Sequence, residues 1–385
     1  MREYRKSIFK SFMRYLRAEY GDELVDLYLY NKTTLREVKG DWPLLVELEK
    51  DVDAGLDVIH RCCESRFWEW EGGSRLIFWR WPKGFRKEAR DGTPIFISGK
   101  LPRYTHRQKW PTKEDERKAI MKKLNKVQKR GYVSEGHVCS LTNYFCVPKG
   151  KDDIRMVYDA TGCGLNEVVS PPNFFMPTMD SCLRAVDATT YSGDNDLGEM
   201  FLNYMLHIYI LPYVGIDITE CVLPPNENPY ASKYVSKENT RDWQRWNRYM
   251  MGFLQSPYNA IKACHHSEEV IRGNTHDPLS PFYWDCVVLN LPGSSNYNPA
   301  MPWVYKWNSK WKCIGGDICT FVDDMRPTGK DFDHCERVQH TTAARSNYLG
   351  QQDAARKRRF PSQSPGLWSG GLIKTDGKNV LVSTS

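Results

Sequence analysis

The sequence Asp317-Ile-Cys-Thr-Phe-Val-Asp-Asp-Met325 is the part of this chain that decides its fold. Its apolar run predicts a strand, and the consecutive acids Asp323 and Asp324 fall where that strand turns into a second, short one. Pro327-Thr-Gly329 is expected to break the chain after it. Adjacent carboxylates at a hairpin tip repel each other unless a positive charge lies between them. Divalent cations prefer carboxylate oxygen, so the motif indicates a metal site; the alternative is an ordinary aspartate-containing turn.

Two motifs upstream extend this pattern. Tyr191-Ser-Gly-Asp-Asn-Asp196-Leu-Gly-Glu-Met-Phe201 places another acid at the junction of a predicted strand and helix. Gly252-Phe-Leu-Gln-Ser-Pro257 is a glycine-led turn that enters a helix. The chain therefore carries an acid, then a glycine-led turn, then a pair of acids.

A helix and a strand pair precede these motifs. The pattern predicts a helix over 113–130, capped by Thr112 with Asp115 and closed by Gly131 in the left-handed conformation. The helix has an apolar stripe and a basic remaining surface; the stripe consists of Ile120, Leu124 and Val127. Strands are predicted at Tyr144–Pro148 and Arg155–Tyr158, joined by the polar turn 150–153.

Other segments have weaker patterns. Residues 1–60 are expected to be helical, from apolar positions such as Ile8, Phe12 and Leu16. The aromatic and basic stretch 67–94 suits either stacking of bases or a small sheet with buried tryptophans. A Pro-rich connector at 171–177 leads to a long amphipathic segment over 180–208, and residues 265–312 are expected to form an irregular insertion.

Composition limits the class of protein. The chain has 385 residues, of which 41% are hydrophobic, enough for one large or two ordinary domains. The net charge of +7 suits a polyanionic partner. Scattered cysteines and the lack of a signal peptide or an apolar membrane-spanning run indicate an intracellular, non-secreted protein without a membrane partner. Cys264-His265-His266 is too crowded for a structural zinc site.

The motifs, in their order, resemble the fingers and palm of the reverse transcriptases of retroelements. Three further segments contribute to the resemblance: Val147-Pro-Lys149 with Ile154-Arg155 and Gly164-Leu-Asn166; Lys357-Arg-Arg-Phe360; and Pro365-Gly-Leu-Trp-Ser-Gly370-Gly-Leu-Ile373. The resemblance covers about residues 113–373.

The resemblance implies an α+β, right-hand polymerase fold, with an antiparallel palm sheet backed by helices. Fingers would occupy 111–190 and 207–251, and palm 191–206 and 252–385, with the insertion at about 265–312 and a primer-grip-like hairpin. Residues 1–110 would form an N-terminal helical and aromatic/basic region of unknown role. The thumb and ribonuclease H domains of the family are expected to be absent from these residues.

The resemblance also implies roles for single residues. Asp196, Asp323 and Asp324 would be the catalytic carboxylates that bind two Mg²⁺ ions, with Mn²⁺ as a substitute. Nucleotide-binding positions would be Lys149, Arg155, Phe201, Gly252, Gln255, Ser256 and Lys357. Phe201 would exclude a 2′-hydroxyl, and Lys357 would deliver a cation or a proton to the leaving pyrophosphate. The primer grip would comprise Leu367, Trp368, Ser369 and Gly370. The implied partners are an RNA or DNA template, a primer strand and dNTPs.

Some positions depart from the family. Met251 stands where a glutamine is usual, and Tyr191 precedes Asp196 by one residue too many. A second register would make Asp194 the metal ligand and bring Glu199 to the ribose, as in RNA-dependent RNA polymerases. The alternatives to a reverse transcriptase are therefore an RNA-dependent RNA polymerase and a catalytically inactive, polymerase-like RNA-binding module.

Overall fold

The computed structural model describes residues 2–22, 24–25, 48, 52, 88, 91–149, 153–219 and 243–384. The chain divides into two compact units, one of residues 1–90 with 348–350 and one of 91–347 with 351–385. In the first, α1 (Arg2–Tyr20) buries Phe12 and Leu16 one turn apart, as the helical spacing predicts. Residues 67–87 and 89–90 and most of the expected helical region beyond α1 lie outside the described residues.

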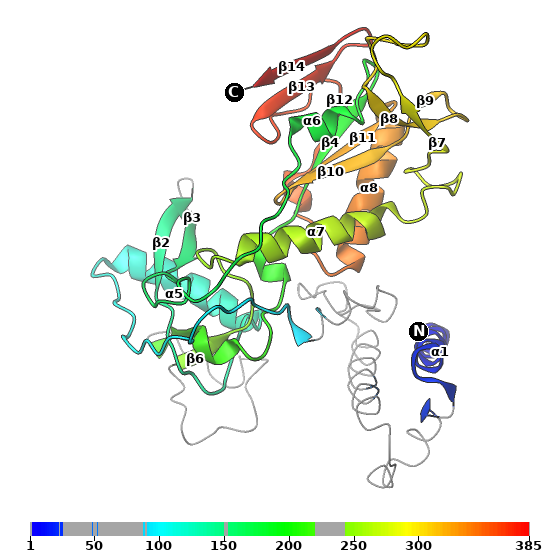
Figure 1. The fold of residues 1–385 in the computed structure, drawn as a ribbon. Helices are drawn as coiled ribbons and strands as arrows, with labels where there is room; N and C mark the ends of the chain where they lie inside the picture. The colour runs from blue at the N-terminus through cyan, green and yellow to red at the C-terminus, as the bar shows by residue number, and fades with distance from the viewer. Residues whose placement is uncertain are drawn as a thin grey trace. The chain divides into compact units, whose positions relative to one another are not determined.

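The second unit contains a four-stranded antiparallel sheet in the order β10-β11-β4-β12 (Figure 1). Its strands are β10 (Asp317–Phe321), β11 (Asp324–Gly329), β4 (Tyr191–Asp196) and β12 (Arg359–Ser362). The predicted break at Pro327 is wrong, because β11 continues through it to Gly329. Proline has no N–H to donate, and the pairing of β11 with β4 is interrupted between Met325 and Thr328 instead.

Alternation of side chains gives this sheet two different faces. One face packs against α8 (Phe332–Tyr348), where Gln339 donates hydrogen bonds to the carbonyls of Asp194 and Arg359, at 2.9 and 2.7 Å. The other face carries the acids and is covered in part by α6 (Met179–Leu183) and the hairpin of β13 (Gly371–Thr375) and β14 (Val380–Thr384). The apolar cluster between them consists of Cys182, Val186, Trp368 and Ile373, with Cys319 and Phe321 packed against it.

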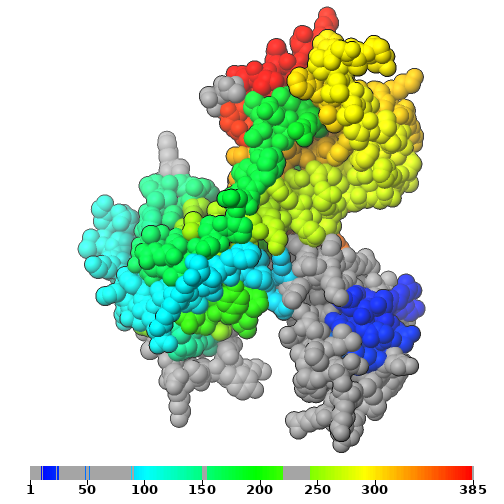
Figure 2. Space-filling model, in the orientation of Figure 1, coloured from blue at the N-terminus to red at the C-terminus, as the bar shows by residue number. Residues whose placement is uncertain are grey.

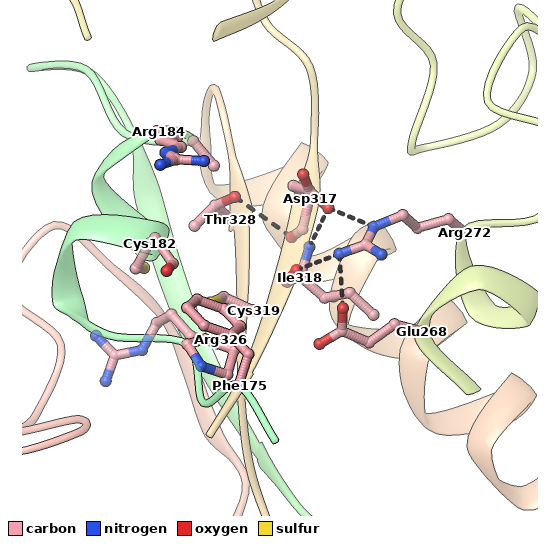
Figure 3. Close-up of a pocket in the computed structure, with 13 residues that line it drawn as sticks. Phe175, Cys182, Arg184, Glu268, Arg272, Asp317, Ile318, Cys319, Arg326 and Thr328 are labelled. Carbon is pink, nitrogen blue, oxygen red and sulfur yellow. Dashed lines mark hydrogen bonds and ion pairs between the residues drawn. The ribbon is translucent and has the colours of Figure 1, made fainter. Parts of the chain in front are cut away.

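Helix α7 (Ser256–Arg272) lies along the open edge of β10. An edge strand presents unpaired backbone groups, and two α7 side chains satisfy them. Arg272 donates to the Ile318 carbonyl at 2.7 Å (Figure 3), and Glu268 accepts from the Thr320 N–H at 2.9 Å. Asp317 accepts from Arg272 at 2.7 Å, which anchors the start of the strand that ends at the paired acids.

A second group of elements surrounds α5 (Glu114–Lys129), which buries Ile120, Leu124 and Val127 as expected. The expected cap is wrong: Lys113 is the N-cap, and no side chain caps the helix. Gly131 has φ +66°, as the left-handed closure requires. The predicted strand pair is present as β2 (Tyr144–Lys149) and β3 (Asp153–Tyr158), whereas residues 150–152 lie outside the described ranges. Beside it lies a three-stranded sheet, β1-β6-β5, of Val133–Ser134, Trp243–Trp246 and Gly215–Asp217.

Two expectations about longer segments are wrong. The segment 180–208 is not one amphipathic element, because it divides into α6, β4 and the 3-10 turn η4 (Met200–Asn203). The segment 265–312 is not irregular throughout: α7 continues to Arg272, and a small sheet follows. Its strands are β7 (Cys286–Leu289), β8 (Val304–Asn308) and β9 (Cys313–Ile314), which are too short to show a period in the sequence.

The nine cysteines within the described ranges are free thiols, five of them buried. Among the helices of those ranges, none combines the length and the apolar character needed to cross a membrane.

Candidate active site

The three acids come together at one end of the four-stranded sheet. Asp324, the first residue of β11, is the direct cross-strand partner of Asp196, the last residue of β4. Residues opposite each other in an antiparallel pair have their Cβ atoms about 4.5–5.5 Å apart. Asp323 is held next to them, because its carbonyl accepts a 2.8 Å hydrogen bond from the Leu197 N–H. Neither contact could be read from the sequence.

The hairpin tip itself is strained. Phe321 pairs with Asp324, so the turn consists of Val322 and Asp323 alone. Val322 has φ +58°, a left-handed conformation that β-branched residues rarely adopt. Such strain persists only where the surroundings enforce it, and it gathers at functional sites. Here the turn brings both Val322 and Asp323 to the wall of a cleft.

Asp196 is nearly buried, with 7% of its surface exposed. Its Oδ2 lies 2.7 Å from Nζ of Lys357, which belongs to the short 3-10 turn η7 (Ala355–Lys357). The chain around η7 is fixed to the same strand end, because the Ala354 N–H donates to the Asp196 carbonyl at 2.8 Å. Oδ1 of Asp196 is buried and has no hydrogen-bond partner. A buried carboxylate oxygen without a donor is a suitable position for a cation.

The other two carboxyl groups are electrostatically crowded. Burial and then the charge of Asp196 raise the pKa of Asp323. Partial burial, followed by the charges of Asp323, Asp196 and Asp194, raises the pKa of Asp324 to about 6. Like charges within a few ångströms disfavour ionisation, and a divalent cation between them would reverse that effect.

These donors fit Mg²⁺ by their chemistry, because they are hard carboxylate oxygens with unmet demand for positive charge. They do not form a ready-made coordination shell: within the described ranges, no three His, Cys, Asp or Glu side chains are arranged to hold a metal ion. Asp196, Asp323 and Asp324 would have to converge further, and Lys357 would have to give up Oδ2 of Asp196.

A cleft of about 410 Å³ opens beside Asp323. Five basic side chains line it, namely Lys123, Lys126, Lys149, Arg155 and Lys357. The rest of its wall is mostly apolar or aromatic and includes Tyr158, Phe201, Trp246 and Met251. A cavity that combines several cations, a carboxylate and apolar walls suits a phosphorylated, partly apolar ligand.

The hairpin of β2 and β3 supplies two of these cations. Val147 is the cross-strand partner of Arg155, and Lys149 follows Val147 by two residues, so Lys149 and Arg155 project from the same face. The charge of Arg155 lowers the pKa of Asp323, against the stronger effect of burial, which raises it.

Phe201 and Glu199 occupy the neighbouring wall, on and just before η4. Glu199 forms ion pairs with Lys126, at 2.8 Å, and with Arg130, so α5 is tied to the residues that follow Asp196. From the sequence, the basic residues of α5 predict only a face exposed to solvent. Their pairing with Glu199 could not be predicted, because that residue is distant in the chain.

The glycine-led turn shapes the cleft through its backbone. Gly252 has φ +105°, and a Cβ on it would lie 2.0 Å from the Tyr158 carbonyl oxygen. Gln255 is fully buried and holds the backbone of Phe96, whose N–H donates to Gln255 Oε1 at 3.0 Å. The Ser256 hydroxyl donates to the Met250 carbonyl at 2.8 Å. These side chains support the turn and do not line the cleft, whereas Met251 does.

The expected primer-grip segment forms a tight turn against the acid hairpin. Trp368 and Gly371 exchange hydrogen bonds of 2.8 and 3.0 Å, and Ser369 and Gly370, with φ +49° and +75°, fill a two-residue turn. Trp368 is buried, and its Nε1 donates to the Asp324 carbonyl at 3.3 Å. Leu367 is exposed.

Asp194, the alternative metal ligand, lies on the same face as Asp196 but is paired with arginines. Its Oδ1 is 2.8 Å from Nε of Arg326, and its Oδ2 is 3.5 Å from Arg359. The geometry therefore favours Asp196 over Asp194 as the position for a cation. Arg326 was missed from the sequence, because a buried arginine in a strand can be identified only once its partner is known.

No protein-family model and no curated protein matches the chain. Solved structures similar to it include the foamy viral protease–reverse transcriptase dRH in complex with double-stranded DNA, at 12% identity and a TM-score of 0.48. That match covers 80% of this chain and 45% of the other. A second similar structure is the CSH mutant of the prototype foamy virus protease–reverse transcriptase, at 14% identity and a TM-score of 0.45. That match covers 70% of this chain and 28% of the other. The native form of that protein matches at 15% identity and a TM-score of 0.43, over 71% of this chain and 28% of the other. This chain thus spans less than half the length of these proteins.

Proposed function

We propose that this chain is an RNA-directed DNA polymerase that adds deoxynucleotides to the 3′-hydroxyl of a primer, as reverse transcriptases do. The observation that carries the proposal is the meeting of Asp324 with Asp196 across β11 and β4, beside a cleft lined by basic side chains. In this proposal the sheet of β4, β10, β11 and β12 belongs to the palm, and α5 with β2 and β3 belongs to the fingers.

Asp196, Asp323 and Asp324 would hold two Mg²⁺ ions. When bound, such a pair of ions lowers the pKa of the attacking hydroxyl and stabilises the attacking and leaving oxygens of an in-line displacement. The Leu197 N–H, which donates to the Asp323 carbonyl, would hold that residue beside the end of β4 as charge builds up.

The basic side chains of the cleft would bind the triphosphate. Arg155 and Lys149 project from one face of their hairpin toward the cleft, where they would neutralise phosphate oxygens. Lys357 already contacts Asp196 at 2.7 Å, so its ammonium group is near the reacting atoms. Once a metal took over Asp196, Lys357 would be free to deliver a cation or a proton to the leaving pyrophosphate.

The residues in the wall of the cleft would favour binding of deoxynucleotides over ribonucleotides. Phe201 is a bulky ring five residues after Asp196 and would crowd a 2′-hydroxyl. Glu199, which an RNA polymerase would use to accept a hydrogen bond from that hydroxyl, is engaged by Lys126 and Arg130. The template and primer would contact the basic surface of α5, so binding should weaken steeply with salt.

The test is extension of a labelled primer on RNA and on DNA templates, with Mg²⁺ and either dNTPs or rNTPs. We expect extension with dNTPs, none with Asp196→Asn, and measurable use of rNTPs by Phe201→Val. Extension with rNTPs alone would identify an RNA polymerase. Binding of RNA without any product, across Mg²⁺ and Mn²⁺, would identify an inactive RNA-binding module and overturn the proposal.

A further inference from the structure

Arg326 is an unusual residue for its position. It lies in β11, two residues after Asp324 and on the same face of the sheet, and only 1% of it is exposed. Figure 3 shows it between α6 and the strands β10 and β11, where it lines a cavity of about 250 Å³ with Phe175, Cys182 and Cys319. A guanidinium so deeply buried must be paired to be tolerated.

Its contacts join three segments that are distant in the chain. Nε lies 2.8 Å from Oδ1 of Asp194, which is two residues before Asp196 on the neighbouring strand. Its terminal nitrogen donates to the Gly366 carbonyl at 3.0 Å, and its guanidinium carbon lies 5.7 Å from the centre of the Trp368 ring. Arg326 therefore contacts both strands that carry the acids and the turn beside them.

Trp368 completes the connection. Its Nε1 donates to the carbonyl of Asp324 itself, at 3.3 Å, and its ring lies 6.2 Å from that of Phe321 at the base of the same hairpin. The turn at 366–371 is thus attached to the acid hairpin through Trp368 and through Arg326. Any displacement of the turn would be transmitted to Asp324, and the reverse.

Stability alone does not account for this arrangement. A buried ion pair is often no more stabilising than apolar side chains of the same volume, but it fixes one relative orientation of the segments that it joins. The neighbouring cluster of Cys182, Val186, Trp368 and Ile373 is apolar, so packing against that side does not by itself require a charge.

We infer that Arg326, anchored by Asp194, is a positioning residue that couples the turn at 366–371 to Asp196 and Asp324. The inference rests on the proposed function in one respect: the turn would hold the primer end, so that its orientation relative to the acids sets the rate of addition. Asp194 is then the anchor of this coupling and not a metal ligand.

Hydrogen exchange tests the coupling without reference to activity. The variants are Arg326→Met, the milder Arg326→Lys, and Trp368→Phe, which keeps an aromatic side chain but removes the N–H donor to Asp324. We expect the backbone amides of both 322–326 and 366–371 to exchange at least about 5-fold faster, with those of 333–346 unchanged. The matched control is Arg337→Met, since Arg337 also covers a tryptophan, Trp311, at 5.6 Å, away from the acids.

Rates of primer extension test the consequence. We expect Trp368→Phe and Arg326→Lys to lower the maximal rate of addition about 10- to 100-fold, with dNTP affinity and the Mg²⁺-induced shift in melting temperature within about 2-fold of wild type. Asp194→Asn/Arg326→Met should be no slower than Arg326→Met alone, because the two residues act through one contact.

The inference is overturned if the milder variants leave exchange at 322–326 unchanged, or if they leave the rate of addition unchanged in an active wild type. A wild type that extends no primer would instead sink the proposed function, and the exchange measurement would still decide the coupling. Should Arg326→Met not fold, Arg326→Lys and Trp368→Phe carry both measurements.

Discussion

Nζ of Lys357 lies 2.7 Å from Oδ2 of Asp196, so the most buried of the three acids already has a monovalent cation beside it. The ammonium group contacts one oxygen only, and the other, Oδ1, stays buried without a hydrogen bond. A lysine is a point charge on a flexible stem, which can leave a carboxylate without moving the backbone. The pair therefore keeps Asp196 compensated in a site that is expected to accept divalent ions.

Replacing Lys357 with methionine should expose this role. Without divalent ions, Lys357→Met is expected to lower the free energy of unfolding by about 1–2 kcal/mol, because Asp196 loses its partner. Saturating Mg²⁺ should remove most of that difference, which thermal melts with and without the ion would show. Lys330→Met, whose partner Asp331 is half exposed, is the control and should change little. If Lys357→Met were destabilised to the same extent at all Mg²⁺ concentrations, the replacement of the lysine ammonium by Mg²⁺ at Asp196 would be contradicted.

Substituting the acids separates chemistry from binding. Asp196→Asn, Asp323→Asn and Asp324→Asn are each expected to reduce primer extension by about 10³-fold or more, because each would remove a ligand of the proposed ions that stabilise the displacement. Affinity for a primer–template duplex, measured by anisotropy, should stay within about 3-fold. Asp333→Asn, an exposed acid on α8, provides the control. Full activity in any of the three variants would remove that residue from the site.

The raised pKa of Asp324 gives a pH dependence with a definite sign. The folded-state pKa is about 6, above the ordinary value of 3.8, so the folded protein retains a proton that the unfolded chain loses between these values. Folding is therefore penalised as the pH rises through that window, and the penalty is complete above about pH 6. Without Mg²⁺, Asp324→Asn should raise the melting temperature at about pH 7 and should not raise it at about pH 4. The rise should be only about 1–2 °C, because solvent screens the charge of an exposed carboxylate. A larger gain at pH 4 would reverse the sign and refute the crowding of these acids.

The features that the sequence predicted correctly depend on neighbours in the chain. The strand that leads to Asp323 and Asp324 and the burial of Ile120, Leu124 and Val127 on α5 follow from local periodicity, and Gly131 from the backbone conformation that only glycine adopts readily.

The features that the sequence did not predict depend instead on contacts between segments that are distant in the chain. Thr112 offers a cap, but Lys113 is the N-cap, and no side chain caps the helix. The stretch 180–208 was expected to be one long amphipathic segment, yet it divides into α6, β4 and η4, and β4 pairs with β11 and β12 from later parts of the chain. The partners of Arg326 and Glu199 come from remote segments, and only the folded chain identifies them.

Arg155 provides a test of the cleft as a triphosphate site. Arg155→Ala should raise the Michaelis constant for dNTP about 10- to 100-fold and lower the maximal rate less, because in the proposed site the guanidinium would bind phosphate in the ground state as well as in the transition state. Affinity for primer–template should remain near that of wild type. Arg103→Ala removes an exposed arginine that does not line the cleft and should leave both constants unchanged. Equal losses in both variants would indicate a general effect of charge and not a site.

The turn at Gly252 can be tested through stability, because two of its constraints can be separated. Gly252 has φ +105° and meets the Tyr158 carbonyl, whereas Gly377 has φ +85° and has nothing within 4 Å of an added Cβ. Alanine at Gly377 therefore suffers only the left-handed conformation, which costs about 1–2 kcal/mol. Alanine at Gly252 adds a clash with backbone that cannot yield without separating β3 from the turn, so we expect a loss above about 4 kcal/mol or failure to fold. Urea unfolding of both variants makes the comparison. If Gly252→Ala cost no more than Gly377→Ala, the close approach of the turn to β3 would be wrong, and with it the shape of the cleft beside Asp323.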